Sequence, residues 1–312
     1  MTKVNEIAER DAAIEEIAKR LGVRAERGRR FAELTSLHVG GAIDWVAVPE
    51  TEETAAAFVN ELDQKGIAWR PLGSGSNVLA DDGEHHYVIV SLKELKADPR
   101  FDGEKVSVTA GYSLPRLCID AARQGLSGIE GLNGIPGTVG GALWMNAGAF
   151  GQEIGTVVEN IRAARGGRVV EIPGSDVKWN YRHTSFREGE LLLGATLMLR
   201  HDDVEKIRAR MEEAKGKRLS SQPHGARSAG CFFKNPPDSV STGKILDDLG
   251  LKGARRGGAV VSEKHANFIV TDGEDAKAAD ALELAEQIRE RVKREHGIEL
   301  EYEVELWRSE NR

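Results

Sequence analysis

The sequence predicts a protein of the α+β class with two regions that divide near residue 215. Strand-like and helix-like segments alternate before residue 215, and a further mixed unit follows it. Glycine is also unusually frequent, at 35 of 312 residues where ~7% is typical. The length allows about two domains of roughly 150 residues each.

The N-terminal residues 1–30 are typical of an amphipathic helix followed by a basic connector. Thr51 is expected to cap a helix that ends at Gly66, and Ser113 to cap another. Cys118 lies on the apolar face of that second helix and is expected in the core. Strands are expected at 45–48, 67–72, 87–90, 106–108 and 191–199, a hairpin at 157–170 and a helix at 204–214.

The second region begins with the basic and polar segment 215–228, which is the best candidate for a linker. Near the C-terminus, 278–292 has helical spacing, and Gly297 is expected to end that helix. From 298 to 306, apolar residues alternate strictly with four glutamates. This alternation predicts a strand with a solvated acidic face.

Composition excludes several functional classes. The net charge of −7 argues against a strongly basic nucleic-acid surface. Cys118 and Cys231 lack metal-ligand spacing, so a disulfide scaffold is excluded and a metal site is disfavoured. His85-His86 is expected on the surface. No apolar run of 18 residues and no secretory signal is present, so we expect a cytoplasmic protein without membrane insertion.

Two glycine-rich segments lie about 60 residues apart. In the first, Gly73, Ser74, Gly75, Ser76 and Asn77 follow a predicted strand, and their backbone N–H groups suit a phosphate. The pattern is not the dinucleotide fingerprint G-x-G-x-x-G. A tight polar turn is the alternative interpretation.

The second segment runs from Gly134 through Ile135, Pro136, Gly137 and Thr138 to Gly140-Gly141, and continues to Gly148. Glycines at these spacings permit close backbone approach to a flat or anionic group. Tight packing between core elements is the alternative. Because packing explains two such clusters less easily than one, we expect a large pyrophosphate cofactor to contact both.

Three further segments carry reactive groups. Arg182 follows Tyr181 and suits a carboxylate clamp, although a surface ion pair is the alternative. Cys231 lies among small and aromatic residues, where a free thiol is more often part of the core than reactive. Glu301 and Glu303 belong to the acidic row near the C-terminus.

Together these segments resemble the UDP-N-acetylenolpyruvoylglucosamine reductase family, also called UDP-N-acetylmuramate dehydrogenases, in its type II branch. The resemblance rests on five motifs in the family's order and covers about Phe31 to Leu306. It is carried by Gly73-Ser-Gly-Ser-Asn77, Gly134-Ile-Pro-Gly-Thr-Val-Gly-Gly141 with Met145-Asn-Ala-Gly148, Tyr181-Arg182, Ser228-Ala-Gly-Cys-Phe-Phe-Lys-Asn-Pro236 and Ser262-Glu-Lys-His-Ala-Asn-Phe268.

The resemblance implies a two-lobed FAD-binding domain of the vanillyl-alcohol-oxidase type, followed by a smaller α+β substrate-binding domain. The N-terminal extension would be 1–30, the FAD-binding domain 31–214 with lobes at about 31–95 and 96–214, and the substrate-binding domain 215–312. The protein would be a monomer that takes a UDP-sugar substrate and no nucleic acid.

The resemblance also implies residue roles. FAD would bind without a covalent link, and NADPH would be the co-substrate. The implied cofactor-binding residues are Gly73, Ser74, Gly75, Ser76, Asn77, Gly134, Ile135, Pro136, Gly137, Thr138, Gly141 and Gly148. The implied catalytic residues are Arg182, Cys231 and Glu303, and the implied substrate-binding residues are Tyr181, Arg182, Gln222 and Asn235.

In the implied reaction, hydride from NADPH reaches the enolpyruvyl double bond through the flavin. Arg182 stabilises the developing negative charge, Glu303 holds the carboxylate side, and Cys231 protonates the carbon. The sequence departs from the family at Cys231, where serine is common, and at Tyr302, where proline is usual. An oxidase of the same fold and a non-catalytic nucleotide-binding module are the rival interpretations.

Overall fold

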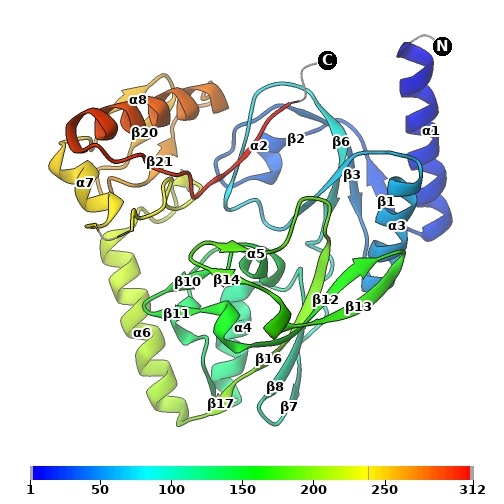
Figure 1. The fold of residues 1–312 in the computed structure, drawn as a ribbon, viewed down its shortest axis with the longest axis horizontal. Coiled ribbons are helices and arrows are strands. Elements are labelled where there is room, and N and C mark those ends of the chain that lie inside the picture. The colour runs from blue at the N-terminus through cyan, green and yellow to red at the C-terminus, as the bar shows by residue number, and fades with distance from the viewer. Residues whose placement is uncertain (1–2, 238, 310–312) are drawn as a thin grey trace. The chain divides into compact units, whose positions relative to one another are not determined.

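The computed structural model describes residues 3–237 and 239–309, which form two compact units (Figure 1). The first unit contains the chain up to Gly28, Ile43–Ser74 and His86–Lys215. The second contains Arg29–Ala42, Gly75–His85 and the chain from Gly216 onward.

The predicted domains differ from these units at three places. Residues 31–42 and 75–85, expected in the FAD-binding domain, pack with the second unit, and residues up to Gly28 pack with the first. Residues 75–85 belong to the second unit because the strand Val78–Ala80 pairs in parallel with Glu305–Trp307. The expected boundary at 214/215 lies one residue from the division at Lys215/Gly216.

The first unit has two hydrophobic cores. Around one core, a sheet has the order β1-β3-β6-β4, and Ile14 and Ile17 of the N-terminal helix are buried there with Phe58. Its elements are α1 (Lys3–Leu21), β1 (Arg24–Glu26), β3 (Ala42–Val48), α3 (Glu52–Gln64), β4 (Trp69–Leu72) and β6 (His85–Ser91).

The other core of the first unit lies against an antiparallel sheet of order β13-β12-β16-β8-β7 (Figure 1). The elements of this half are β7 (Arg100–Asp102), β8 (Lys105–Thr109), α4 (Leu114–Arg123), α5 (Val139–Trp144), β12 (Val158–Arg165), β13 (Arg168–Pro173), β16 (Leu192–Met198) and α6 (Val204–Ser221). Three short pairs complete it: β9 (Leu126–Ser127) with β17 (Arg200–His201), β10 (Gly148–Ala149) with β11 (Gln152–Glu153), and β14 (Trp179–Asn180) with β15 (His183–Thr184).

The second unit contains a four-stranded antiparallel sheet of order β18-β21-β20-β19, against which α8 packs (Figure 1). Ala281, Ile288 and Val292 of α8 are buried in this core. The elements are β2 (Arg29–Arg30), α2 (Phe31–Leu34), β5 (Val78–Ala80), β18 (Arg227–Ser228), α7 (Thr242–Asp248), β19 (Arg255–Arg256), β20 (Ala259–Val261), β21 (Ile269–Thr271), α8 (Ala278–His296) and β22 (Glu305–Trp307).

The predicted helix ends are confirmed. Thr51 forms a capping box with Thr54, and the Ser113 hydroxyl accepts from the Arg116 N–H. Gly297 ends α8 in the left-handed conformation with φ of 70°. Cys118 is buried on the inner face of α4, as expected.

The predicted strand over 298–306 is largely wrong. Only Glu305–Trp307 is a strand, and the preceding residues make a short pairing centred on the bridge between Phe233 and Tyr302. Buried Leu300 and Val304 preserve part of the alternation. Burial of alternate residues therefore does not require a continuous ladder of backbone hydrogen bonds.

Two other expectations are wrong. The segment 215–228 is not a linker throughout, because α6 continues to Ser221; its lysines and arginines favour a helix, and Pro223 limits it. His85 is buried rather than exposed, with its ring 4.7 Å from that of Phe31 and its Nε2 3.3 Å from Asp81 Oδ1. In the described part of the chain, no helix is long and apolar enough to cross a membrane.

Candidate active site

The start of the first predicted glycine cluster lies against the second cluster, within the first unit. Gly73 follows β4, and a Cβ placed on it would lie 2.5 Å from Oγ1 of Thr138. Since real Cβ atoms do not approach this closely, only glycine fits without a shift. The start of the first cluster therefore packs against the second cluster. A single cofactor that contacts both clusters would require this proximity.

The second cluster presents its backbone on a fixed support. Gly137 accepts through its carbonyl from the Leu114 N–H at 3.1 Å, and the Gly140 N–H donates to the Ala110 carbonyl at 2.8 Å. Gly137 has a φ of 145°, which disfavours any residue with a side chain. Gly134, Pro136 and Gly141 are exposed along this fixed segment.

The surroundings of Gly140 and Gly141 restrict a side chain to different degrees. A Cβ on Gly140 would lie 2.9 Å from Cβ of Ala110, so this glycine serves packing. A Cβ on Gly141 would find its nearest neighbour at 3.7 Å, at Thr138 Oγ1, and Gly141 is exposed. Packing does not require glycine at position 141, which fits a surface that a large cofactor approaches closely.

The rest of the first cluster belongs to the second unit. Gly75 has a φ of 64°, and a Cβ there would lie 2.3 Å from the Leu34 carbonyl oxygen. Asn77 donates through Nδ2 to the Glu303 carbonyl at 3.0 Å and accepts through its own carbonyl from the Glu305 N–H at 2.9 Å. The predicted cofactor loop thus holds the segment that carries the predicted catalytic glutamate.

The same glutamate segment is bonded to the segment of Cys231. The Glu303 N–H donates to the Phe232 carbonyl at 3.0 Å, and the Lys234 N–H donates to the Glu301 carbonyl at 2.9 Å. Cys231 and Glu303 are both half-buried. Two predicted catalytic residues therefore lie on neighbouring, hydrogen-bonded stretches of one unit.

Burial and pairing distinguish the two candidate glutamates. The Glu301 side chain is 76% exposed, and one of its oxygens lies 3.3 Å from Nζ of Lys234. Between them, Tyr302 stacks on Phe233 and donates its hydroxyl to Glu286 of α8 at 2.6 Å, and burial raises the pKa of this phenol. Tyr302 thus connects the segment to α8.

Arg182 lies at the two-residue turn between β14 and β15, in the first unit. Its φ of 54° is uncommon for a residue with a side chain. Its Nη2 donates to the Gly148 carbonyl at 2.8 Å, and its guanidinium carbon lies 4.9 Å from the centre of the Tyr181 ring. Tyr181 is 44% exposed. The arginine is thereby held beside an exposed aromatic ring.

Gly148 packs at the base of this arginine. A Cβ on Gly148 would lie 2.8 Å from Cγ of Glu153 and 3.2 Å from Nη1 of Arg182. Its small size therefore serves the arginine site in this structure.

The predicted substrate residues of the second unit make local contacts. Oε1 of Gln222 accepts from Nη1 of Arg218 at 3.1 Å, and Oδ1 of Asn235 accepts from the Thr242 N–H at 3.0 Å, at the start of α7. Asn235 is exposed. It is therefore oriented by α7 while remaining accessible.

Two residues were quoted in motifs without a role, and the structure gives each a defined place. Asn146 is fully buried beneath the Arg182 turn. His265 lies against α7, where a Cβ on Gly243 would be 2.9 Å from its ring, and burial together with the charge of Lys252 lowers its pKa. A helix-ending asparagine and a histidine before a strand carry no sequence signal of these contacts.

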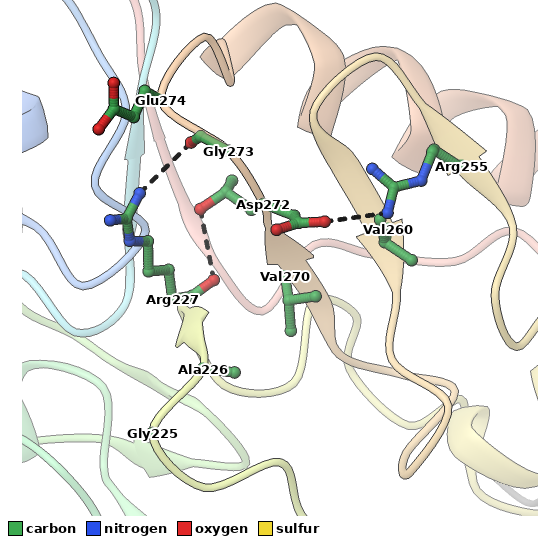
Figure 2. A pocket seen from close by; sticks show the side chains of 10 residues that line it. Gly225, Ala226, Arg227, Arg255, Val260, Val270, Asp272, Gly273 and Glu274 are labelled. Carbon is green, nitrogen blue, oxygen red and sulfur yellow. Dashed lines mark hydrogen bonds and ion pairs between the residues drawn. The ribbon is translucent and has the colours of Figure 1, made fainter.

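A cavity of about 490 Å³ lies elsewhere in the second unit, beside β18, β20 and β21 (Figure 2). Figure 2 shows Arg227 and Arg255 on either side of Asp272. Arg227 donates to the Gly273 carbonyl at 3.4 Å, and Arg255 pairs with Asp272 at 3.1 Å. Because both cations have protein partners and the lining includes none of the predicted site residues, this cavity is separate from the candidate site.

Among residues 3–237 and 239–309, no group of three or more histidine, cysteine, aspartate or glutamate side chains is arranged to hold a metal ion.

Two family models match separate parts of the chain. Residues 43–168 match the FAD binding domain family, and residues 222–307 match the C-terminal domain of UDP-N-acetylenolpyruvoylglucosamine reductase. The fold and site thus define a flavin-dependent oxidoreductase with a mixed α/β FAD-binding domain, as predicted.

Whole-chain relatives identify the family. The chain is 40% identical over 291 residues to the UDP-N-acetylenolpyruvoylglucosamine reductase of Geobacter sulfurreducens, covering 92% of this chain and 96% of the relative. It is 37% identical over 283 residues to that of Thermotoga sp. (strain RQ2), covering 89% and 93%. The chain belongs to the UDP-N-acetylenolpyruvoylglucosamine reductase family, and FAD is its cofactor.

A solved structure supports the same assignment. The crystal structure of UDP-N-acetylenolpyruvylglucosamine reductase from Thermus caldophilus is 36% identical, with a TM-score of 0.79, and covers 91% of this chain and 99% of that chain. The predictions of the family, the fold class and a flavin-dependent reductase of peptidoglycan precursor synthesis are confirmed.

Proposed function

We propose that this reductase uses NADPH as its hydride donor and that Arg182, Cys231 and Glu303 act on the enolpyruvyl ether of UDP-N-acetylglucosamine. One observation carries the assignment of the last two. Glu303 is bonded through its N–H to the residue after Cys231 and through its carbonyl to Asn77 of the glycine-rich loop. A carboxyl group, a thiol-bearing segment and a cofactor loop are therefore fixed together in one unit.

When bound, FAD would supply hydride transfer from the nicotinamide to the alkene carbon distal to the ether. Negative charge then develops on the carbon between the ether oxygen and the carboxylate, and it delocalises into the carboxylate. Arg182 supplies fixed positive charge for this group. Its anchor on the Gly148 carbonyl restrains the guanidinium before substrate arrives.

The thiol of Cys231 donates the proton to that carbon. A thiol is a stronger acid than the hydroxyl that the family commonly has, and it is therefore the better proton donor. Glu303, in its protonated form, donates a hydrogen bond to the carboxylate side of the substrate. Gln222, Asn235 and Tyr181 contact the UDP-sugar.

The cofactor-binding residues in this proposal are those of the two glycine clusters together with Gly148, and FAD is held without a covalent bond. The packing of Gly73 against Thr138 supports binding of one cofactor to both clusters. We further propose that the protein is a monomer and that it is cytoplasmic, the latter being the setting that the composition favours.

Anaerobic stopped-flow kinetics tests the proton donor, because the two half-reactions are measured separately. Cys231→Ala should leave reduction of the flavin by NADPH near the wild-type rate. Reoxidation by the enolpyruvyl substrate should slow by roughly 10²-fold or more, the usual contribution of a general acid. Cys231→Ser should recover much of this rate.

The other cysteine provides a matched control. Cys118 is buried in α4 of the first unit, so Cys118→Ala should leave both half-reactions largely intact. If Cys231→Ala slows both half-reactions equally, Cys231 is structural and the assignment of the proton donor is wrong.

A further inference from the structure

Asn146 is a buried polar residue in a strained conformation. It is fully buried in the first unit, two residues after the end of α5, and has a φ of 46°. Asparagine tolerates this left-handed region better than most residues, but a buried amide there must still find hydrogen-bond partners.

Three partners fix the orientation of this amide. Its Nδ2 donates to Oε2 of Glu153 at 2.9 Å and to the Asn180 carbonyl at 3.0 Å. Its Oδ1 accepts from the Gly155 N–H at 3.0 Å. Both donor hydrogens and the acceptor are used, so a carboxylate of the same shape cannot replace them.

The Asn180 carbonyl immediately precedes the turn that carries Tyr181 and Arg182. The segment from Trp144, the last residue of α5, to Gly148 holds the hairpin of this turn through three alternate residues. The Thr184 hydroxyl donates to the Trp144 carbonyl at 2.8 Å, Asn146 donates to Asn180, and Arg182 donates to the Gly148 carbonyl at 2.8 Å. Of the three contacts, only that of Asn146 uses a side chain of the segment 144–148; the other two use the carbonyl groups of Trp144 and Gly148.

Gly155 makes this arrangement possible. A Cβ on Gly155 would lie 2.5 Å from the Trp179 ring of the same hairpin and 2.8 Å from Oδ1 of Asn146. The close packing of Trp179 and Asn146 over Gly155 therefore leaves the β14–β15 hairpin little freedom to shift.

We propose that Asn146 is a positioning residue for Arg182: its amide holds the strained turn so that the guanidinium is preset for the substrate carboxylate. The inference rests on the proposed role of Arg182. A misplacement of about 1 Å in a charge-stabilising group can cost ~10²-fold in rate. The hold on the turn should therefore affect the step that uses Arg182 and no other step.

The test is a double-mutant cycle in the FAD-loaded enzyme. Asn146→Asp keeps the shape and the acceptor for Gly155, but it cannot donate to Asn180 and places a carboxylate beside Glu153. It should retain flavin content and the rate of reduction by NADPH within about twofold. Reoxidation by the enolpyruvyl substrate should fall about 10- to 100-fold.

The cycle is completed with Arg182→Ala and the double variant. If Asn146 acts through Arg182, Asn146→Asp should slow reoxidation less than twofold further in the Arg182→Ala background. Equal factors in both backgrounds, or equal slowing of both half-reactions, would overturn the inference. Reoxidation that is unchanged in Arg182→Ala alone would instead remove the proposed role of Arg182 itself.

Two further variants guard against a general loss of structure. Asn160→Asp makes the same change at a half-buried asparagine on β12 of the same unit and should leave reoxidation unaltered. Asn146→Gly accepts the left-handed backbone and removes all three bonds, so it should reproduce the selective loss if Asn146→Asp does not fold.

Discussion

The neighbouring glycines 140 and 141 allow a direct test of where the cofactor lies. Both precede the middle of α5, so alanine should favour the helix at either position by roughly 0.5–1 kcal/mol. Their surroundings differ. The new methyl group meets Ala110 at 2.9 Å in Gly140→Ala, but has only Thr138 Oγ1 at 3.7 Å in Gly141→Ala.

These distances give opposite effects on the apoprotein. Overpacking at position 140 costs about 1–3 kcal/mol, which exceeds the gain in helix propensity. Gly140→Ala should therefore lower the melting temperature of the apoprotein. Gly141→Ala should leave it unchanged or raise it by about 1–3 °C.

FAD affinity should change differently. If FAD lies against the exposed backbone of Gly141, the added methyl group occupies space that the cofactor needs, and Gly141→Ala should weaken FAD binding at least about tenfold, or ~1.4 kcal/mol. The assay removes the flavin, records thermal unfolding of the apoprotein, and then titrates FAD by fluorescence. A more stable apoprotein with weakened FAD binding is the expected result.

One outcome refutes this reasoning. If Gly141→Ala binds FAD as tightly as the wild type, the cofactor does not approach this glycine, and the open space around it has another cause. Gly140→Ala is the matched control, because its loss of stability should appear with or without FAD.

Two further predictions concern carboxylates. Glu303→Ala, which removes the hydrogen bond to the substrate carboxylate, should slow reoxidation by the enolpyruvyl substrate at least tenfold, whereas Glu301→Ala at the exposed glutamate should change it less than a few-fold; the reverse order in stopped-flow traces would move the catalytic assignment to Glu301. For Glu130, burial acts to raise the pKa, but hydrogen bonds from the Gly128 N–H, Ser127 and Arg210 outweigh it and hold the pKa below its ordinary value of 4.5. A depressed carboxyl pKa stabilises the fold above the unfolded-state value and loses that contribution as pH falls through the folded-state value. Glu130→Gln should therefore lower the melting temperature by about 2–6 °C at pH 7, with a gap to the wild type that closes below pH 4.5, and a gap independent of pH would contradict this.

The sequence predicted elements whose stability is local. The Thr51 and Ser113 caps, the Gly297 end of α8 and the apolar face that buries Cys118 all depend on residues within a few positions of one another. Such interactions repeat in many proteins and leave a recognisable spacing.

Elements that depend on distant partners were predicted less well. The alternation at 298–306 indicated a strand, but strand pairing needs a neighbour along its whole length, and β5 provides one only for Glu305–Trp307. His85 appeared to belong to the surface because its apolar partner Phe31 lies far away in the sequence. Periodicity measures which residues are buried and cannot show what buries them.

At the candidate site, too, the sequence predicted a residue but not the distant contacts that fix its position. Motif spacing identified Arg182, but the means of holding it required the structure, since Trp144, Asn146 and Gly148 contact the turn at alternate positions from 34 or more residues away. Both Arg182 and Asn146 adopt positive φ, a conformation that local propensity opposes. Tertiary contacts must therefore maintain these conformations, and such a cost is retained where a side chain has to be fixed before the substrate arrives. The strain at this turn and the hydrogen bonds that hold it thus support one interpretation. The strained turn lowers the stability of the fold and in return fixes a positive charge before the substrate binds.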